Sequence, residues 1–199
     1  LLNLAQVFGE VIGQGVGAEA IMGLALTMPI MSLTAAFGAM VGVGAATFIS
    51  VKLGQKDYDT AKHILSNTMT LNLIMGLGVG LVCLLFLDPI LRFFGASDQT
   101  IPYARDYMVI ILLGNVITHM YFGLNAVLRA AGKPKHAMSA TIFTVVLNTL
   151  LDPLFIYTFG LGIKGAAYAT VLAQSLALIW QLYTFSRPKE LLHFKRGTF

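Results

Sequence analysis

Apolar residues fill long, nearly uninterrupted stretches of this chain, with no regular polar face between them. The stretches cover residues 20–49, 64–87, 107–128, 137–159 and 165–186. About 20 apolar residues in a helix cross the roughly 30 Å hydrocarbon core of a bilayer, whereas helices of water-soluble domains usually keep a polar face. The pattern therefore predicts an all-α, polytopic membrane helix bundle with five complete transmembrane helices.

Glycine, proline and aspartate mark the connections between these stretches. Gly54 is a stop signal, followed by Asp57 or Asp59 as an N-cap, and Gly132 with Pro134 ends another helix. The sequence FGLGIKG (159–165) predicts a tight hairpin. Residues 1–8 are too few to span a bilayer, and we interpret them as the end of a first helix whose beginning is missing. We expect a transmembrane lobe over residues 1–187 and a linker over 188–199.

Composition supports a lipid environment. The chain is 57% hydrophobic and 11% charged, with a mean hydropathy of +0.78, whereas soluble domains carry about 25% charged residues. The net charge of +4 does not indicate a nucleic-acid partner, because the basic residues lie in short connections and form no amphipathic face. The single cysteine, Cys83, excludes an internal disulfide.

Basic residues alternate between rich and poor connections. Ten of the thirteen lie near residues 55, 132 and 192, and the intervening connections hold only Arg92, Arg105 and Lys164. Cytoplasmic loops of inner-membrane proteins carry such an excess of Lys and Arg. We therefore expect a multi-pass protein of the cell inner membrane with the loops near 55, 132 and 192 in the cytoplasm.

Asp152 is the one acidic residue well inside an apolar stretch. A carboxylate at such depth is costly and is most often functional. Asn148 lies one helical turn earlier, and together the two offer oxygen ligands for H⁺ or Na⁺. Pro153 removes a backbone donor and disfavours helical geometry at Asp152, which predicts a kink. The alternative is a buried acid held by a neighbouring group purely for packing.

Other polar residues within the stretches are weaker candidates. Asn72, Asn115 and His119 are possible substrate-cavity residues. The alternative for the two Asn residues is hydrogen bonding between helices, and His119 is otherwise a proton relay or a hydrogen-bonded core group. The GxxxG pairs Gly38–Gly42 and Gly76–Gly80 predict close helix packing. An integral-membrane enzyme is disfavoured, because the chain contains neither HExxH nor GxGD and no plausible Ser–His–Asp set.

Several segments, taken together and in order, resemble the amino-terminal half of prokaryotic MATE (multidrug and toxic compound extrusion) transporters. They are GVGAEAIMGLALTMPI (15–30), GVGAATFISVKLGQKDYDTAK (42–62), FGAS (94–97) with YARDYMVIILLG (103–114), LNAVLRAAGKPKHAM (124–138) and LNTLLDPLFIYTFGLGIKGAAYAT (147–170). The resemblance covers nearly all of the chain.

This resemblance implies one six-helix lobe of a twelve-helix antiporter that exports drug-like organic compounds in exchange for H⁺ or Na⁺, with no further cofactor. The partners are then the lipid bilayer, the substrates and a missing carboxy-terminal lobe. Asn148 and Asp152 match the family's cation site, and the resemblance adds Thr170 and Tyr107. Apart from Na⁺ at Asp152 and Asn148, it implies no metal.

Three points stay open. The family usually has an Asp in the first helix where VFGEVIGQGVG (7–17) has Phe8, and Glu10 is two residues out of register. A flippase for lipid-linked oligosaccharides, from the same superfamily, is the closest alternative, although no Lys or Arg lies deep in a span to hold pyrophosphate. A separate six-helix protein that forms a homodimer is another.

Overall fold

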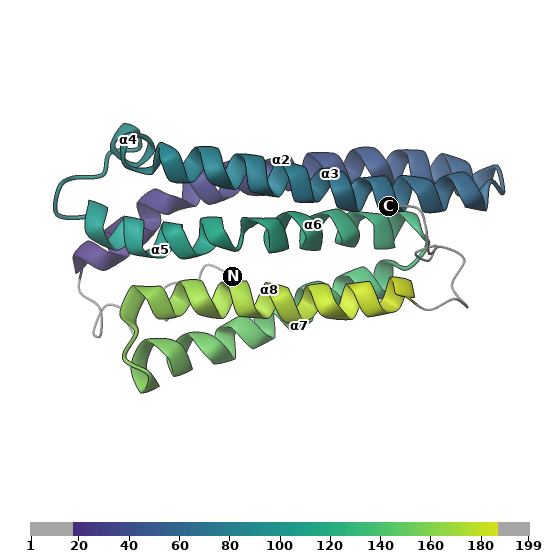
Figure 1. The fold of residues 1–199 in the computed structure, drawn as a ribbon. Coiled ribbons are helices and arrows are strands. Elements are labelled where there is room, and N and C mark those ends of the chain that lie inside the picture. Colours follow the sequence, from purple (N-terminus) through teal and green to yellow (C-terminus); the bar gives the residue numbers. More distant parts are fainter. Residues whose placement is uncertain (1–17, 187–199) are drawn as a thin grey trace.

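The computed structural model describes residues 18–186, and every described element is helical (Figure 1). The elements are α2 (Ala18–Gly54), α3 (Tyr58–Leu85), α4 (Leu87–Phe93), α5 (Ile101–Leu113), α6 (Asn115–Ala130), α7 (Pro134–Pro153), the π-helical η1 (Leu154–Thr158) and α8 (Gly162–Ser186). Expectations about residues 1–17 and 187–199, including Phe8, Glu10, the first helix and the linker, lie outside this range.

Four of the five predicted spans are continuous helical segments, and a bent helix pair stands in place of the other. Four helical segments are long and apolar enough to cross a membrane: Ile21–Gly54, Tyr58–Leu85, Pro134–Thr158 and Gly162–Ser186. The third span, predicted as one helix over 107–128, is instead the pair α5 and α6, bent by 56°. The bend falls at Gly114, where a Cβ atom would lie 2.7 Å from the Val171 side chain of α8. The close approach of α8 therefore coincides with the break.

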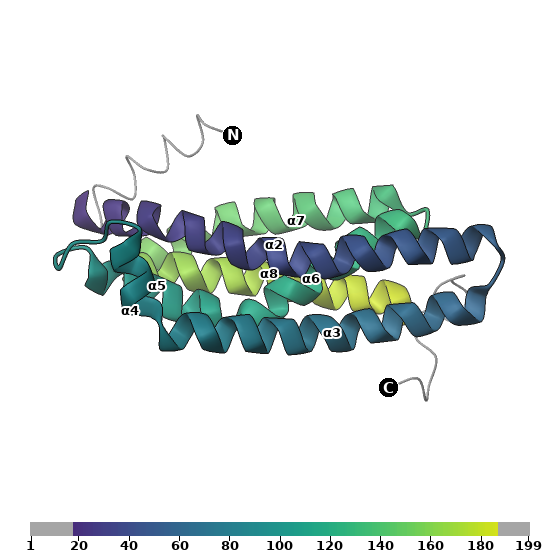
Figure 2. The same cartoon turned by 90° about the horizontal axis from the view of Figure 1, so that it is seen from above.

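The long helices run roughly alongside one another, which brings alternate connections to opposite ends of the bundle (Figures 1 and 2). The α2–α3 and α6–α7 connections, which are rich in Lys and Arg, share one end, here called the basic end. The α3–α5 segment, which includes Arg92, and the starts of α5 and α8, which carry Arg105 and Lys164, lie at the other end, here called the paired end. The grouping matches the alternation in the sequence.

Helix signals in the basic-end connections act largely as predicted. α2 ends at Gly54, and Gly132 has a φ of +75°, a left-handed conformation that favours glycine. Asp57, not Asp59, is the N-cap of α3, and its carboxylate accepts a hydrogen bond from the Thr60 amide at 3.2 Å. Hydrogen bonding by Thr60, from its side chain and then from its amide, lowers the pKa of Asp57.

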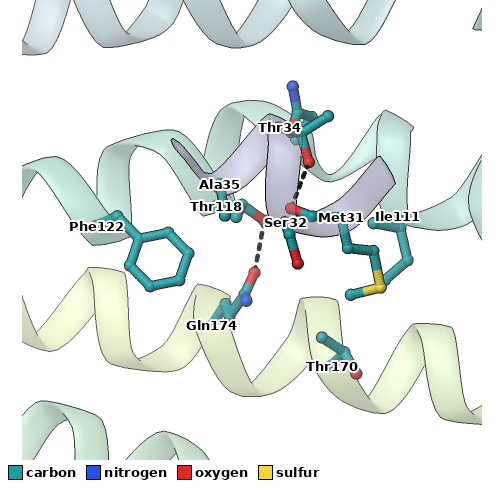
Figure 3. Close-up of a pocket in the computed structure, with 10 residues that line it drawn as sticks. Met31, Ser32, Thr34, Ala35, Ile111, Thr118, Phe122, Thr170 and Gln174 are labelled. Atoms are coloured by element: carbon teal, nitrogen blue, oxygen red, sulfur yellow. Dashed lines mark hydrogen bonds between the residues drawn. The ribbon is translucent and has the colours of Figure 1, made fainter. Parts of the chain in front are cut away.

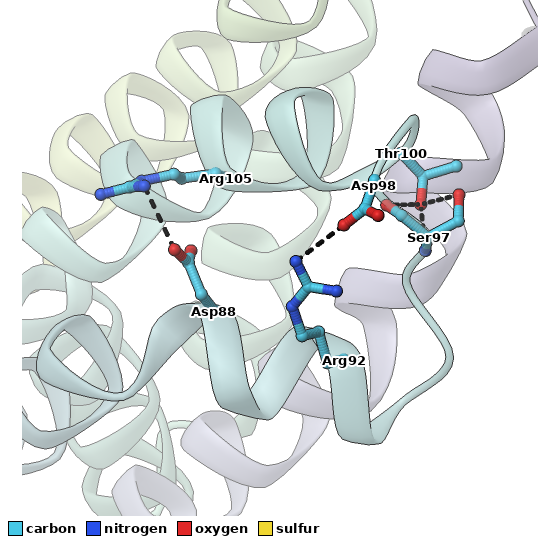
Figure 4. Close-up of polar contacts among 6 residues, drawn as sticks. All are labelled: Asp88, Arg92, Ser97, Asp98, Thr100 and Arg105. Carbon is cyan, nitrogen blue, oxygen red and sulfur yellow. Dashed lines mark hydrogen bonds and ion pairs between the residues drawn. The ribbon is translucent and has the colours of Figure 1, made fainter.

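The short helix α4 at the paired end was not predicted, because its seven residues follow directly on an apolar span. Ion pairs fix it to its neighbours (Figure 4). Asp88 pairs with Arg105 of α5 at 3.2 Å, and Arg92 pairs with Asp98 at 2.7 Å. Ser97 and Thr100 hydrogen-bond each other to close the turn before α5.

The GxxxG glycines allow close packing, as predicted. A Cβ atom on Gly42 of α2 would lie 2.7 Å from the Gly123 Cα of α6, and one on Gly76 of α3 would lie 2.8 Å from the Val116 Cα. α2, α3 and α6 form the most extensively contacting group, and α8 joins α5 and α6 to α7. Only glycine leaves room for these backbone contacts.

The helix does not end at Asp152, where Pro153 was predicted to cause a kink. α7 continues through Asp152 and Pro153 with helical backbone angles and then widens into the π-turn η1. A wider turn accommodates the proline without breaking the helix. Because Pro153 lacks an N–H, the Thr149 carbonyl still receives no helical hydrogen bond from it.

We predict that Gly42→Ala destabilises the full-length protein by about 1–2 kcal/mol, because the added methyl group forces α2 away from Gly123. Gly44→Ala is the matched control, since its Cβ atom would meet nothing within 4 Å. Thermal melting of both variants in detergent checks this. Equal melting temperatures for the two would contradict the close α2–α6 contact.

Candidate functional site

Asp152 lies in the part of α7 nearer to the paired end. It follows the first residue of α7 by 18 positions and precedes Thr158, the last residue of η1, by six. At about 1.5 Å per residue, these separations are roughly 27 Å and 9 Å. The side chain is half-buried. Its distance from the basic end places it far from the lysines of the α2–α3 and α6–α7 connections.

The Asn148 side chain joins Asp152 to α8. The Asn148 Nδ2 donates to Asp152 Oδ1 at 3.1 Å and to Thr170 Oγ1 at 3.3 Å. The Thr170 hydroxyl donates in turn to the Ala166 carbonyl of its own helix at 3.0 Å. A turn of α7 and a turn of α8 are therefore connected through one amide, and three of the predicted site residues lie together.

Tyr107 brings α5 to the same group. Its buried phenol is close enough to interact with the Thr170 hydroxyl and with the charge of Asp152. The preceding residue, Asp106, pairs with Lys164 of α8 at 3.2 Å, which ties the starts of α5 and α8 together at the paired end. All four residues predicted for the cation site thus meet where α5, α7 and α8 converge.

This arrangement presents oxygen atoms to a cation. Asp152 supplies a carboxylate and Thr170 a hydroxyl, while the Asn148 amide uses its N–H groups as donors and keeps its oxygen. Within the described residues, Asp152 forms no ion pair with Lys or Arg. The described residues also contain no group of three or more His, Cys, Asp and Glu side chains suited to a transition metal. The site's chemistry therefore suits H⁺ or Na⁺.

A cavity of about 240 Å³ adjoins this group (Figure 3). Its walls come from α2, α5, α6 and α8 and carry hydroxyl, amide and apolar side chains without a formal charge: Met31, Ser32, Thr34, Ala35, Ile111, Asn115, Thr118, Phe122, Thr170 and Gln174. Thr170 belongs both to the cavity wall and to the Asp152 group. An occupant of the cavity would therefore touch a residue that contacts Asn148.

Thr118 and Gln174 are cavity residues that the sequence analysis missed. The Thr118 hydroxyl donates to Gln174 Oε1 at 2.6 Å, from α6 to α8 (Figure 3). Gln174 follows Thr170 by four residues and so lies on the same face of α8. That spacing could have identified Gln174 from the sequence as a neighbour of Thr170 on α8.

The three weaker candidates separate in the structure. Asn115 lines the cavity and donates to the Gly76 carbonyl of α3 at 3.0 Å. His119 and Asn72 are not among the residues lining this cavity. They are buried where α2, α3 and α6 pack: Gly38 faces the His119 ring, and Gly123 faces the Asn72 amide. Among the described residues, the Asn72 amide donates to the Thr68 carbonyl and the His119 ring hydrogen-bonds with the Asn115 carbonyl, each at 3.0 Å and each within one helix. Asn72 therefore shows no hydrogen bond between helices there, and the role of both residues in a cavity stays a prediction.

Comparison with known proteins gives consistent results. The family model described as MatE matches residues 1–154. The multidrug export protein MepA of Staphylococcus haemolyticus (strain JCSC1435) is 35% identical over 174 residues, which are 87% of this chain and 38% of that protein. MepA of Staphylococcus aureus (strain MRSA252) is 32% identical over 172 residues, with 86% and 38% covered. The chain thus spans about two fifths of the length of these relatives.

Solved structures match the fold. An inward-facing multidrug resistance MATE family transporter of the MOP superfamily superposes with a TM-score of 0.91 at 28% identity, over 100% of this chain and 46% of that one.

We predict that Thr118 and Gln174 are energetically coupled. In a double-mutant cycle with Thr118→Val and Gln174→Leu, the loss of stability in the double variant should fall short of the summed single losses by about 0.6 kcal/mol, a typical value for side-chain hydrogen bonds between membrane helices. Thr47→Val serves as a control with Gln174→Leu, because the Thr47 hydroxyl bonds only to its own helix, at Val43. Strict additivity for Thr118 and Gln174 would contradict the bond between α6 and α8.

Proposed function

The chain belongs to the MatE family of multidrug export transporters, and on that basis we propose that the full-length protein exports drugs and other toxic organic compounds across the cytoplasmic membrane in exchange for H⁺ or Na⁺. The observation that carries the proposal is the Asp152–Asn148–Thr170 group, a carboxylate in an apolar span held by an amide and a hydroxyl. This chain, a multi-pass membrane segment, contributes the coupling-ion site and part of the drug path.

The coupling step is the neutralisation of Asp152. In the ion-free state the carboxylate draws the Asn148 amide toward it, and the same amide reaches Thr170. Binding of H⁺ or Na⁺ neutralises the carboxylate. The hydrogen bond from the Asn148 amide to Asp152 then weakens, and with it the link between α7 and α8. A cation shifts an equilibrium between two arrangements only as far as it binds one of them more tightly. A neutral Asp152 favours the arrangement with a weaker drug site.

Thr170 communicates this change to the cavity. Its hydroxyl accepts from Asn148, and its side chain lies in the cavity wall. Drug and cation therefore compete through one side chain, without needing to overlap. Cation binding from the outside releases the drug outward, and loss of the cation to the cytoplasm restores the site for the next drug molecule.

The orientation follows from the distribution of charge. The basic end faces the cytoplasm, in agreement with the excess of Lys and Arg in its connections. Asp152 then lies nearer to the external surface, from which the driving cation enters. A carboxy-terminal lobe, supplied by the part of the protein beyond this chain, completes the drug path.

A flippase for lipid-linked oligosaccharides has less support. A pyrophosphate group needs basic side chains to hold it, and the ten residues around the described cavity include none. MepA, to which the chain is similar, is named as an exporter and not as a flippase or an enzyme.

We predict that Asp152→Asn in the full-length protein abolishes coupled export, reducing it at least tenfold, while membrane insertion and melting temperature change little. An amide of the same shape cannot carry the charge that the cation neutralises. The measurement is drug efflux from proteoliposomes driven by a pH gradient or, separately, by a Na⁺ gradient, which also identifies the coupling ion.

Asp98→Asn is the control, because it removes the same charge from an exposed position at the same end. It should export at the wild-type rate. Normal gradient-driven export by Asp152→Asn would overturn the assignment of this residue.

A further inference from the structure

The two ends of the bundle differ in how many of their basic residues are paired with acids. At the paired end, Arg92, Arg105 and Lys164 each meet an acid within 3.2 Å. At the basic end, the described residues provide six bases and two acids, Asp57 and Asp59, which leaves a formal net charge of +4: the bases are Lys52, Lys56, Lys62, Arg129, Lys133 and Lys135. Of the four lysines Lys52, Lys56, Lys62 and Lys135, only Lys52 forms an ion pair among the described residues, with Asp57 at 3.3 Å. Positive charge therefore accumulates at one end.

An apolar groove of about 370 Å³ opens between α7 and α8 close to this charge. Ser139, Phe143, Leu176 and Trp180 line it, and the Phe143 and Leu176 side chains are exposed. Ser139 lies one turn along α7 from Lys135 and donates to the Lys135 carbonyl at 2.7 Å. Trp180 lies six residues before the end of α8. The groove thus occupies the part of the α7–α8 seam nearest to the basic end.

One of the groove residues, Trp180, belongs to a stacked pair of aromatic rings. His136 in the first turn of α7 stacks on Trp180 of α8, with ring centroids 6.2 Å apart and planes inclined by 17°. Lys135, next to His136, is exposed at the same helix start. Charge and amphipathic rings therefore lie beside the apolar groove near the ends of two apolar spans, and residues of this kind favour the boundary between hydrocarbon and headgroups.

We propose that this seam is a binding site for an anionic phospholipid, with one acyl chain in the groove and the phosphate at Lys135 and the start of α7. The groove supplies an apolar wall along the direction of an acyl chain, and the net charge of +4 supplies attraction for an anionic headgroup. A zwitterionic lipid fits the groove equally well but gains nothing from the charge. The paired end, where each described base has an acid partner, offers no comparable attraction.

Native mass spectrometry of the full-length protein in detergent tests the site, with phosphatidylglycerol and phosphatidylcholine of identical acyl chains as probes. The wild-type protein should bind phosphatidylglycerol more tightly. Lys135→Gln should weaken phosphatidylglycerol binding about fivefold, the factor that corresponds to roughly 1 kcal/mol per basic residue at a membrane surface, and leave phosphatidylcholine binding unchanged.

Two further variants make the test specific. Lys164→Gln makes the same chemical change at the paired end and should not alter the binding of either lipid. Ser139→Phe fills the groove and should weaken both lipids, with the melting temperature recorded to confirm folding. Equal effects of Lys135→Gln and Lys164→Gln, or equal affinities of the wild-type protein for the two lipids, would overturn the proposal. Unchanged lipid binding by a folded Ser139→Phe variant would also overturn the proposal. That result is expected if the rest of the protein covers the groove.

Discussion

The account depends on one hydrogen-bonded group, in which the Asn148 amide links the Asp152 carboxylate on α7 to the Thr170 hydroxyl on α8. A carboxylate in an apolar span is stable only if polar groups compensate for the water it has lost. Here the compensation is neutral, with no guanidinium or ammonium engaged by Asp152 among the described residues. A carboxylate held by neutral donors keeps its affinity for a cation, whereas one paired with arginine does not.

The remainder of the bundle keeps these three residues in register. Contacts between glycines, such as Gly42 of α2 with Gly123 of α6, bring the backbones of α2, α3 and α6 close together. The Lys164–Asp106 ion pair connects α8 to α5 at the paired end. The bend at Gly114 divides the third span where Val171 of α8 packs against it. Thr170, the residue before Val171 on α8, contacts Asn148 and also lines the cavity. The helix that packs against the bend at Gly114, α8, therefore also carries the residue that contacts Asn148.

The sequence was informative where one physical preference dominates. The long apolar runs defined the spans, and an isolated acid in such a run indicated Asp152 and, by helical spacing, Asn148. Thr170 and Tyr107 came only from the resemblance, since nothing in the spacing connects residues on different helices. The break at Gly114, helix α4 and the Thr118–Gln174 bond depend on tertiary neighbours. Pro153 was expected to disturb the helix by local rules, and the structure shows α7 helical through Asp152 with a π-turn directly after Pro153. The roles of the site residues remain predictions.

Infrared difference spectroscopy of the full-length protein tests the central claim most directly. Spectra would be recorded with and without the coupling cation, at fixed drug concentration, for the wild-type protein and Asp152→Asn. If Asp152 takes up the cation, the wild-type protein shows a carboxylate band that disappears or shifts on binding, and the variant lacks that change. The same carboxylate change in both proteins would show that the cation binds elsewhere and would contradict the account.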